Sequence, residues 1–303
     1  MLRNVLLFLS EQRYLRRWME TSPWAERLTR RFVAGRSLER ELDVCRRLNR
    51  QGILVTVDHL GEKVSSEEEA AASLEAYLKA VRGIAAERTA ASVSIKLTQF
   101  GMDLSSQLCR RNVETLMREA DAAGGFVEFD MEARQYVDRT LEMAARMHGE
   151  FGRVRCAVQA YLYRSAEDVE ALCRKGIPVR LCKGAYREPP EAAYAAKSRV
   201  DESYLRLSEV LLERGAYPAL ATHDPRMIER AIAFASRKGV PRTGFEFQML
   251  YGIHRDLQAR LVGDGYRLRL YVPYGDAWYP YFMRRLAERP ANLLFLARNL
   301  LRR

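Results

Sequence analysis

The sequence of 303 residues has few of the side chains that build disulfides and metal sites. It contains five cysteines, an odd number with no C-x-x-C spacing, and four histidines with no H-x-H or H-E-x-x-H pattern. Such cysteines are typical of reduced thiols in a cytosolic protein, and scattered histidines do not make a zinc site. We therefore expect a cytoplasmic protein without a bound metal.

A hydrophobic run long enough to cross a membrane is also missing, because a spanning helix needs about 20 apolar residues. The chain begins M-L-R-N-V-L-L-F-L-S, whose apolar run is too short for a secretory signal peptide and is followed by no small-residue cleavage site. Residues 6–9 could lie on a bilayer, on another subunit or on the chain's own core. We expect at most peripheral contact with the inner face of the cell membrane.

Positive charge is in excess, since 50 Lys and Arg stand against 39 Asp and Glu, a formal net charge of +11. Such a charge favours an anionic partner, which could be a substrate group, a cofactor, a membrane surface or a nucleic acid. The basic residues are scattered through the helical segments rather than gathered with aromatic residues, which argues against nucleic acid. The 48% of apolar and 29% of charged residues are typical of a globular protein and exclude disordered and fibrous classes.

Short β-rich segments alternate with helical segments from about residue 50 onward. We expect strands at residues 52–60, 92–100, 125–131, 154–163, 177–186, 217–224, 243–252 and 266–275. We expect helices at residues 65–88, 104–122, 134–147, 166–175, 191–214, 225–238 and 254–261, and a last helix at 278–302 over the barrel mouth. This pattern predicts an α/β protein of the (βα)8 TIM-barrel type. We divide the chain into an N-terminal helical lead-in (1–50) and a catalytic barrel domain (51–303).

The active site of a (βα)8 barrel lies at the carboxyl ends of the strands. There the sequence places a collar of cations and amides that includes Lys96, Gln159, Arg180, Lys183 and Gln248. A metal hydrolase would need more histidines and carboxylates, and acyl transfer would need a placed Ser or Cys with a His. The collar suits a polyanionic, hydrogen-bonding ligand such as a flavin nucleotide.

The expected last helix carries two adjacent arginines and a glutamate in the run M-R-R-L-A-E. Adjacent side chains on a helix point about 100° apart, so Arg284 and Arg285 can both reach one carboxylate. Glu288 follows at a spacing that lets it orient either arginine. The same pattern also fits a solvated helix face, and the residues alone leave both interpretations open.

Several runs, taken in order, resemble bacterial proline dehydrogenase of the monofunctional type. They are V-T-V-D-H-L-G-E, S-I-K-L-T-Q-F-G, F-D-M-E, K-G-A-Y, A-T-H-D, F-E-F-Q-M-L-Y-G and Y-V-P-Y-G followed by R-R-L-A-E, and they extend from about residue 40 to the C-terminus. The resemblance implies a distorted (βα)8 barrel with non-covalent FAD that oxidises L-proline to Δ1-pyrroline-5-carboxylate and passes electrons to a membrane quinone. No run resembles the extra domains of the bifunctional relatives, so we expect a separate pyrroline-5-carboxylate dehydrogenase downstream.

The resemblance also implies roles for individual residues. Asp130 and Arg180 would be catalytic, because Asp130 would orient Lys96 and Arg180 would face the flavin. The substrate would contact Lys96, Tyr186, Leu250, Tyr271, Arg284, Arg285 and Glu288, with Glu62 as a gate. The FAD would contact Met131, Gln159, Arg180, Lys183, Gly184, Ala185, Thr222, His223 and Gln248. Asp224 follows Thr-His where many relatives have Asn, a departure that bears on the phosphate or adenine contacts.

Two other functions remain open. A lysine at a strand end can form an imine, so a Schiff-base aldolase would also use Lys96. A basic nucleic-acid-binding protein would bind duplex or single strands with a steep salt dependence. Proline must be a neutral amine to donate hydride, so the leading hypothesis predicts activity that rises toward alkaline pH.

Overall fold

The computed structural model describes residues 12, 14, 31–61, 63–279 and 281–283. Within these residues eight parallel strands close into a barrel in chain order. They are β1 (Leu54–His59), β2 (Ala91–Ile95), β3 (Val127–Phe129), β4 (Val154–Gln159), β5 (Val179–Cys182), β6 (Ala219–Ala221), β7 (Glu246–Leu250) and β8 (Arg267–Tyr274). The predicted α/β fold of the (βα)8 TIM type is confirmed.

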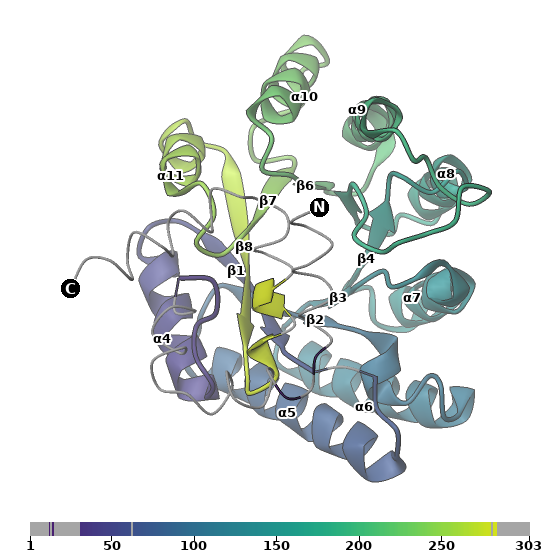
Figure 1. Ribbon diagram of the computed structural model, residues 1–303. Coiled ribbons are helices and arrows are strands. Elements are labelled where there is room, and N and C mark those ends of the chain that lie inside the picture. The colour runs from purple at the N-terminus through teal and green to yellow at the C-terminus, as the bar shows by residue number, and fades with distance from the viewer. Residues whose placement is uncertain (1–11, 13, 15–30, 62, 280, 284–303) are drawn as a thin grey trace.

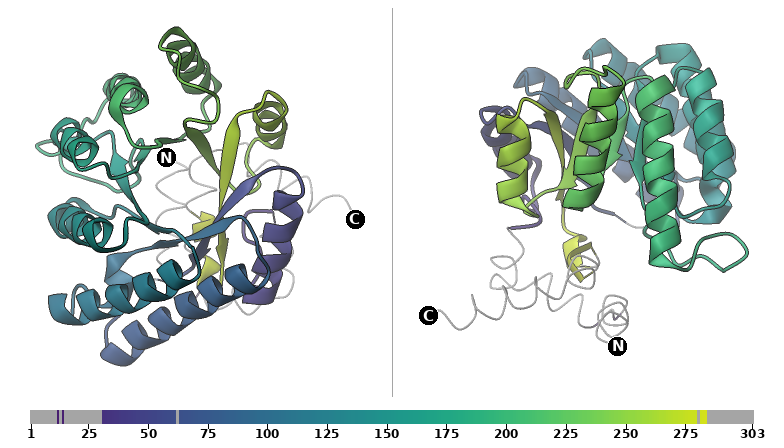
Figure 2. Two further views of the ribbon diagram at one scale, coloured as in Figure 1. Left: turned by 180° about the vertical axis from the view of Figure 1, so that it is seen from behind. Right: turned by 90° about the horizontal axis from the view of Figure 1, so that it is seen from above.

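Helices follow the strands and form a ring around them (Figure 1). Seen from above, they run alongside the strands and cover the outer surface of the barrel (Figure 2). They are α4 (Leu38–Asn49), α5 (Glu67–Ala86), α6 (Ser106–Ala122), α7 (Val137–Phe151), α8 (Ser165–Arg174), α9 (Lys197–Arg214), α10 (Pro225–Arg237) and α11 (Arg255–Gly263), with the 3-10 helices η1 (Leu97–Phe100) and η2 (Arg134–Tyr136).

The strands turn their apolar residues outward, toward the helices. Val127 and Phe129 of β3 are fully buried in the hydrophobic core that the helices complete. Glu128 lies between them, so its side chain points to the opposite face, into the barrel. There its Oε1 accepts a hydrogen bond from the hydroxyl of Thr56 on β1 at 2.5 Å. The interior of this barrel is therefore polar, whereas bulky apolar side chains dominate the interior of most such barrels.

Side-chain caps fix where the helices that flank the site begin. The Ser66 hydroxyl accepts from the backbone N–H of Glu69 at 3.2 Å and starts α5. The Asp224 carboxylate accepts from the backbone N–H of Arg226 at 3.1 Å, and Pro225 occupies the first turn of α10. These caps hold the loops that leave β1 and β6 at defined positions over the barrel.

The strands are shorter than the expected ranges, and after β2 the remaining expected strand residues form a helix instead. Residues 92–100 were expected as one strand, but β2 ends at Ile95 and residues 97–100 form η1. Pairing with β3 extends only to Ile95 opposite Phe129, and Gly101, with a φ of 89°, then turns the chain. Lys96 consequently lies just past the end of the strand, at the collar.

The largest difference at the start of a helix is in the helix that follows β5. A helix was expected over residues 191–214, but α9 begins at Lys197. Ala193 instead forms an isolated antiparallel bridge with Leu162 in the loop after β4. This cross-link uses backbone groups that a helix would need, and it ties the long loop after β5 to the loop after β4.

Segments from near the two ends of the described chain pack together at the carboxyl end of the barrel, against Leu60 after β1 and Ile253 after β7. The Phe32 and Phe282 rings lie 6.1 Å apart between centroids, within a buried cluster of Phe32, Val33, Leu60, Ile253, Trp278, Tyr279, Tyr281, Phe282 and Met283. Most of the expected last helix and most of the expected lead-in lie outside the described residues. The division of the chain at residue 50 therefore stays a prediction.

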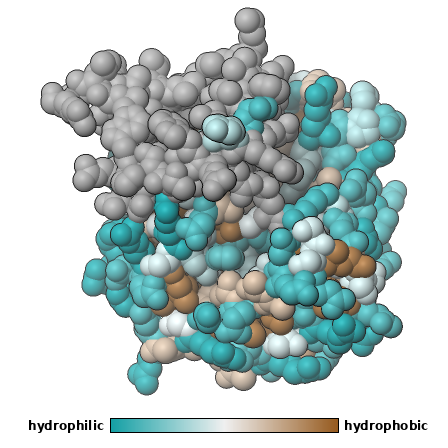
Figure 3. Space-filling model, turned by 60° about the horizontal axis from the view of Figure 1, so that its bottom comes forward, coloured by the Kyte–Doolittle hydropathy of each residue, from teal (hydrophilic) through white to brown (hydrophobic). Residues whose placement is uncertain are grey.

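The outer surface is hydrophilic with separated apolar patches on the face shown in Figure 3, as on most globular proteins. Among the helices that the structure describes, none is both long enough and apolar enough to cross a bilayer.

Candidate active site

Lys96 lies at the carboxyl end of β2 between two carboxylates. Its Nζ is 3.0 Å from Asp58 Oδ1 and 3.0 Å from Asp130 Oδ2, and it donates to the Tyr271 hydroxyl at 3.3 Å. Burial lowers the pKa of Lys96, but the two carboxylates outweigh burial and hold this pKa well above its ordinary value. Lys96 is therefore a fixed ammonium, and the proximity expected between Lys96 and Asp130 is present.

Asp130 follows β3 and joins four elements at one point. Its Oδ1 accepts from the Ser94 hydroxyl at 2.6 Å and pairs with Arg180, while its Oδ2 accepts from the Tyr271 hydroxyl at 2.7 Å and meets Lys96. Burial raises the pKa of Asp130, but Lys96 and then Arg180 outweigh it and hold the pKa far below its ordinary value. Asp130 is thus a permanent carboxylate around which the cations are ordered.

Arg180 crosses the barrel from β5, and its side chain is only 7% exposed. Its Nη2 pairs with Asp130, its Nη1 lies 3.4 Å from Glu128 Oε2, and its guanidinium carbon stands 5.5 Å from the centre of the Tyr271 ring. Two carboxylates and an aromatic face fix both the position and the plane of the guanidinium. The site thus presents a rigid cation beside Lys96.

Asp58 is a site residue to which the sequence analysis assigned no role. Its side chain is 1% exposed at the end of β1, and it shares the Lys96 ammonium with Asp130. The Tyr77 hydroxyl, from α5, lies 3.5 Å from Asp58 Oδ1 and donates to the Ser94 carbonyl at 2.8 Å. The available signal was its place in the run V-D-H-L at the end of an expected strand.

Lys183 directly follows β5 and contacts carboxylates of two helices. Its Nζ lies 2.5 Å from Asp201 Oδ1 of α9 and 3.8 Å from Asp224 Oδ2, the helix-capping carboxylate of α10. The side chain keeps 27% of its surface exposed. An anionic ligand could therefore reach this ammonium while Asp201 and Asp224 compete for it.

Gly184 occupies a position that only glycine fits. Its φ is +122°, and a Cβ added there would lie 2.2 Å from the Tyr161 ring. The absence of a side chain at Gly184 lets another group pack closely against the backbone of this loop.

The two glutamines of the collar have different surroundings. Gln159, at the end of β4, donates to the Glu132 carbonyl at 2.9 Å and accepts from the backbone N–H of Ala185 at 3.3 Å. Gln248, on β7, instead donates to Glu128 at 3.1 Å and to Glu246 at 2.8 Å. Gln159 thus shapes the loop that carries Ala185, while Gln248 bonds to carboxylates within the barrel.

Thr222 and His223 follow β6 and link it to the neighbouring strand and helix. The Thr222 hydroxyl accepts from the backbone N–H of Asp224 at 3.1 Å, and His223 Nε2 accepts from the backbone N–H of Leu250 at 2.8 Å. These bonds hold the loop that runs from β6 to α10. The predicted contacts of Thr222 and His223 with a cofactor, and of Leu250 with a substrate, stay predictions.

The remaining predicted residues divide into two groups. Met131 is 8% exposed and Tyr186 is 40% exposed, so Tyr186 is open to a ligand that approaches from solvent. Four predicted residues lie outside the described part of the chain. They are Arg284, Arg285 and Glu288, which were expected to contact the substrate, and Glu62, which was expected to act as a gate.

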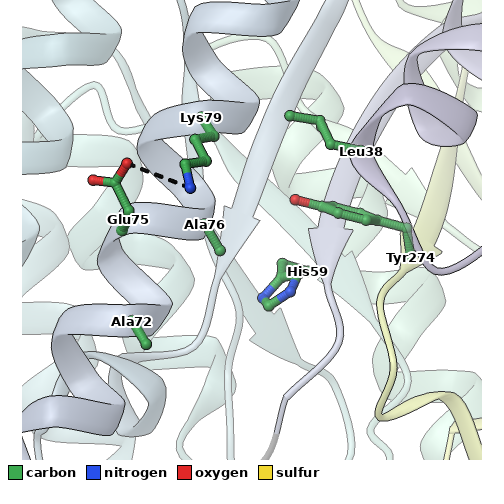
Figure 4. Close-up of a pocket in the computed structure, with 7 residues that line it drawn as sticks. All are labelled: Leu38, His59, Ala72, Glu75, Ala76, Lys79 and Tyr274. Carbon is green, nitrogen blue, oxygen red and sulfur yellow. Dashed lines mark ion pairs between the residues drawn. The ribbon is translucent and has the colours of Figure 1, made fainter.

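A separate pocket of about 330 Å³ lies between β1, β8 and the helices α4 and α5 (Figure 4). His59 and Tyr274 enter it from the strands. His59 follows Asp58 in the strand and so points to the opposite face, which places this pocket outside the collar. The lining residues are Leu38, His59, Ala72, Glu75, Ala76, Lys79 and Tyr274.

Within the described part of the chain, no group of three His, Cys, Asp or Glu side chains could hold a metal ion.

Comparison with known proteins gives a consistent result. The family model described as proline dehydrogenase matches residues 42–298. Proline dehydrogenase 1 of Bacillus subtilis (strain 168) is 39% identical over 304 residues and is aligned over 100% of both chains. Proline dehydrogenase of Deinococcus radiodurans is 38% identical over 305 residues, which cover 99% of this chain and 98% of that protein.

Solved structures agree with the sequence matches. The proline utilization A protein (PutA) of Bdellovibrio bacteriovorus, inactivated by N-propargylglycine, superposes with a TM-score of 0.81 at 29% identity. The match covers 87% of this chain but 33% of that longer chain. The similarity to PutA of Bradyrhizobium japonicum, with a TM-score of 0.75 at 22% identity, supports the fold alone.

Proposed function

The chain belongs to the proline dehydrogenase family, and we propose that it oxidises L-proline to Δ1-pyrroline-5-carboxylate with non-covalently bound FAD and a membrane quinone as the final electron acceptor. The observation that carries this proposal is the joining of Lys96, Asp130, Arg180 and Tyr271, which lie on β5 and β8 or directly after β2 and β3. The cluster offers two fixed cations for an anionic substrate and an anionic cofactor.

The residues after β4, β5 and β6 fit a flavin nucleotide. Lys183 would contact a phosphate, and the missing side chain at Gly184 together with the small one at Ala185 would let the cofactor approach the loop closely. Bound FAD would supply the chemistry by accepting hydride from proline C5 at its N5 atom. Met131, Gln159, Thr222, His223 and Gln248 complete the set that we assign to FAD.

The proline carboxylate would bind to Lys96, whose ammonium is already ordered by Asp58 and Asp130. Arg284 and Arg285 would complete a clamp of three cations, with Glu288 orienting them and Glu62 closing the gate. Leu250, Tyr271 and Tyr186 would form the walls around the ring. Arg180, pinned by Asp130 and stacked on Tyr271, would place its positive charge beside the cofactor ring.

The Schiff-base alternative has less support. An imine-forming lysine must lose its proton to act as a nucleophile. Lys96 is instead paired with two carboxylates at 3.0 Å, and its pKa is raised. This environment favours carboxylate binding over covalent catalysis.

Substitution of Lys96 tests the proposal. The flavin-loaded wild type should reduce an artificial electron acceptor with L-proline. Lys96→Met should lower kcat/KM for proline about 100-fold, mainly through KM, because one charged contact to the carboxylate is lost. Lys175→Met, at an exposed lysine outside the collar, is the matched control and should behave as wild type. An unchanged KM in Lys96→Met with flavin content intact would remove Lys96 from the substrate site.

A further inference from the structure

Ionised side chains in the barrel interior form one continuous chain of alternating charge. Arg155 on β4 lies 3.4 Å from Glu128 and 2.6 Å from Glu246, and Arg269 on β8 lies 2.7 Å from Glu246. Arg180 connects to Glu128 at 3.4 Å, and from there the chain continues into the site. In order the members are Asp58, Lys96, Asp130, Arg180, Glu128, Arg155, Glu246 and Arg269, four carboxylates and four cations.

Such an arrangement is costly, because each buried ion loses several kcal/mol of hydration that its partners must offset. Apolar residues would fill the same space, as they do in most barrels of this type. The cost indicates that the chain serves the site rather than stability alone. Glu128 is the one member that contacts both Arg180, in the site, and Arg155, beneath it.

Hydrogen bonds to both carboxylate oxygens hold the Glu128 side chain in place. Its Oε1 accepts from the hydroxyls of Thr56 at 2.5 Å and Ser92 at 3.1 Å, and its Oε2 accepts from Gln248 at 3.1 Å. Burial raises the pKa of Glu128, but Arg155 and Arg180 outweigh it and lower the pKa to about 2. A full negative charge therefore lies at a fixed distance below the Arg180 guanidinium at every physiological pH.

We propose that Glu128 is a positioning residue that acts as the lower counter-ion of Arg180 and so determines how strongly Arg180 stabilises the reduced flavin. This inference rests on the proposed function, since it requires Arg180 to face the cofactor. Two-electron reduction adds negative charge to the flavin, and a cation beside the ring favours that state. A carboxylate that partly neutralises the cation lowers the reduction potential of the flavin. Removal of the Glu128 charge should therefore raise the reduction potential of the flavin.

The test is the midpoint potential of the bound flavin in the full-length holoenzyme. Glu128→Gln removes the charge. Its amide oxygen can accept from Arg155, Arg180 and Gln248, and its amide N–H groups can donate to the Thr56 and Ser92 hydroxyls, which donate to Glu128 in the wild type. We expect the ratio of the dissociation constants of oxidised and reduced FAD to rise about tenfold, equivalent to a shift of about 30 mV upward for a two-electron couple. The matched control is Glu246→Gln, which removes the same charge from the same chain but contacts Arg155 and Arg269 rather than Arg180. It should shift the potential by less than half as much.

An unchanged potential in Glu128→Gln, a fall, or a shift equal to that of Glu246→Gln would overturn the proposal. Where Glu128→Gln does not fold, Arg155→Met gives an independent test of opposite sign. It removes a cation from Glu128, so the full charge of Glu128 acts on Arg180 and the potential should fall; an unchanged or higher potential contradicts the inference. Failure of the wild type to bind FAD would instead contradict the proposed function, which keeps the two failures distinct.

Discussion

Charge balance around Lys96 determines what this site can bind. Lys96 and Arg180 are matched by Asp58 and Asp130, so this group of four side chains is neutral before a substrate enters. A bound carboxylate adds a negative charge that must be met by further cations or by displacement of Asp58. The clamp that we propose for Arg284 and Arg285 supplies this charge from another part of the chain.

Glu128 should also contribute to acid stability. Its pKa is lowered from 4.5 to about 2 in the folded state, so the ionised carboxylate stabilises the fold fully above pH 4.5, and this contribution is lost as pH falls from 4.5 to about 2. The contribution at neutral pH is a few kcal/mol. Urea unfolding measured across this pH window should show a shallower loss of stability in Glu128→Gln than in the wild type. Parallel curves for the two proteins would show that the Glu128 carboxyl is not tuned by its neighbours.

The loop after β5 depends on one glycine. Gly184→Ala forces a side chain onto a φ of +122° and a Cβ into the Tyr161 ring, so we expect about 1–2 kcal/mol of destabilisation and at least about tenfold weaker FAD binding. Gly176→Ala is the matched control, because its φ is +65° with no atom within 4 Å of the added Cβ. Gly176→Ala should lower the free energy of unfolding by about 1 kcal/mol and leave FAD binding unchanged. Thermal unfolding and FAD titration separate the two effects, and wild-type FAD affinity in Gly184→Ala would exclude this loop from the cofactor site.

The positions of strands and helices could be predicted where the local sequence pattern is strong. Boundaries that depend on contacts with distant residues could not. All eight strands lie where alternating apolar residues and glycine punctuation predict them. The end of β2 depends on where β3 stops pairing, and the start of α9 depends on the bridge between Leu162 and Ala193. Neither partner can be identified from the local sequence, which is why both boundaries were misplaced.

The charged residues inside the barrel could not be predicted from local sequence patterns, whereas the residues at the strand ends could. The convergence of Lys96, Asp130 and Arg180 was predictable because parallel strands bring their carboxyl ends together. Glu128 and Glu246 were missed, because a single charge between apolar residues, as in F-V-E-F and G-F-E-F, is typical of a strand with one face in solvent. Only closure of the barrel turns that face inward and links these charges into one chain.

Visible absorption of the purified protein, recorded before and after anaerobic addition of L-proline, tests the central claim most directly. The account predicts flavin bands that bleach with L-proline in the absence of any other electron donor, which would identify cofactor and substrate class together. A colourless protein that cannot be reconstituted with FAD, or bound flavin that L-proline leaves oxidised, would contradict the account.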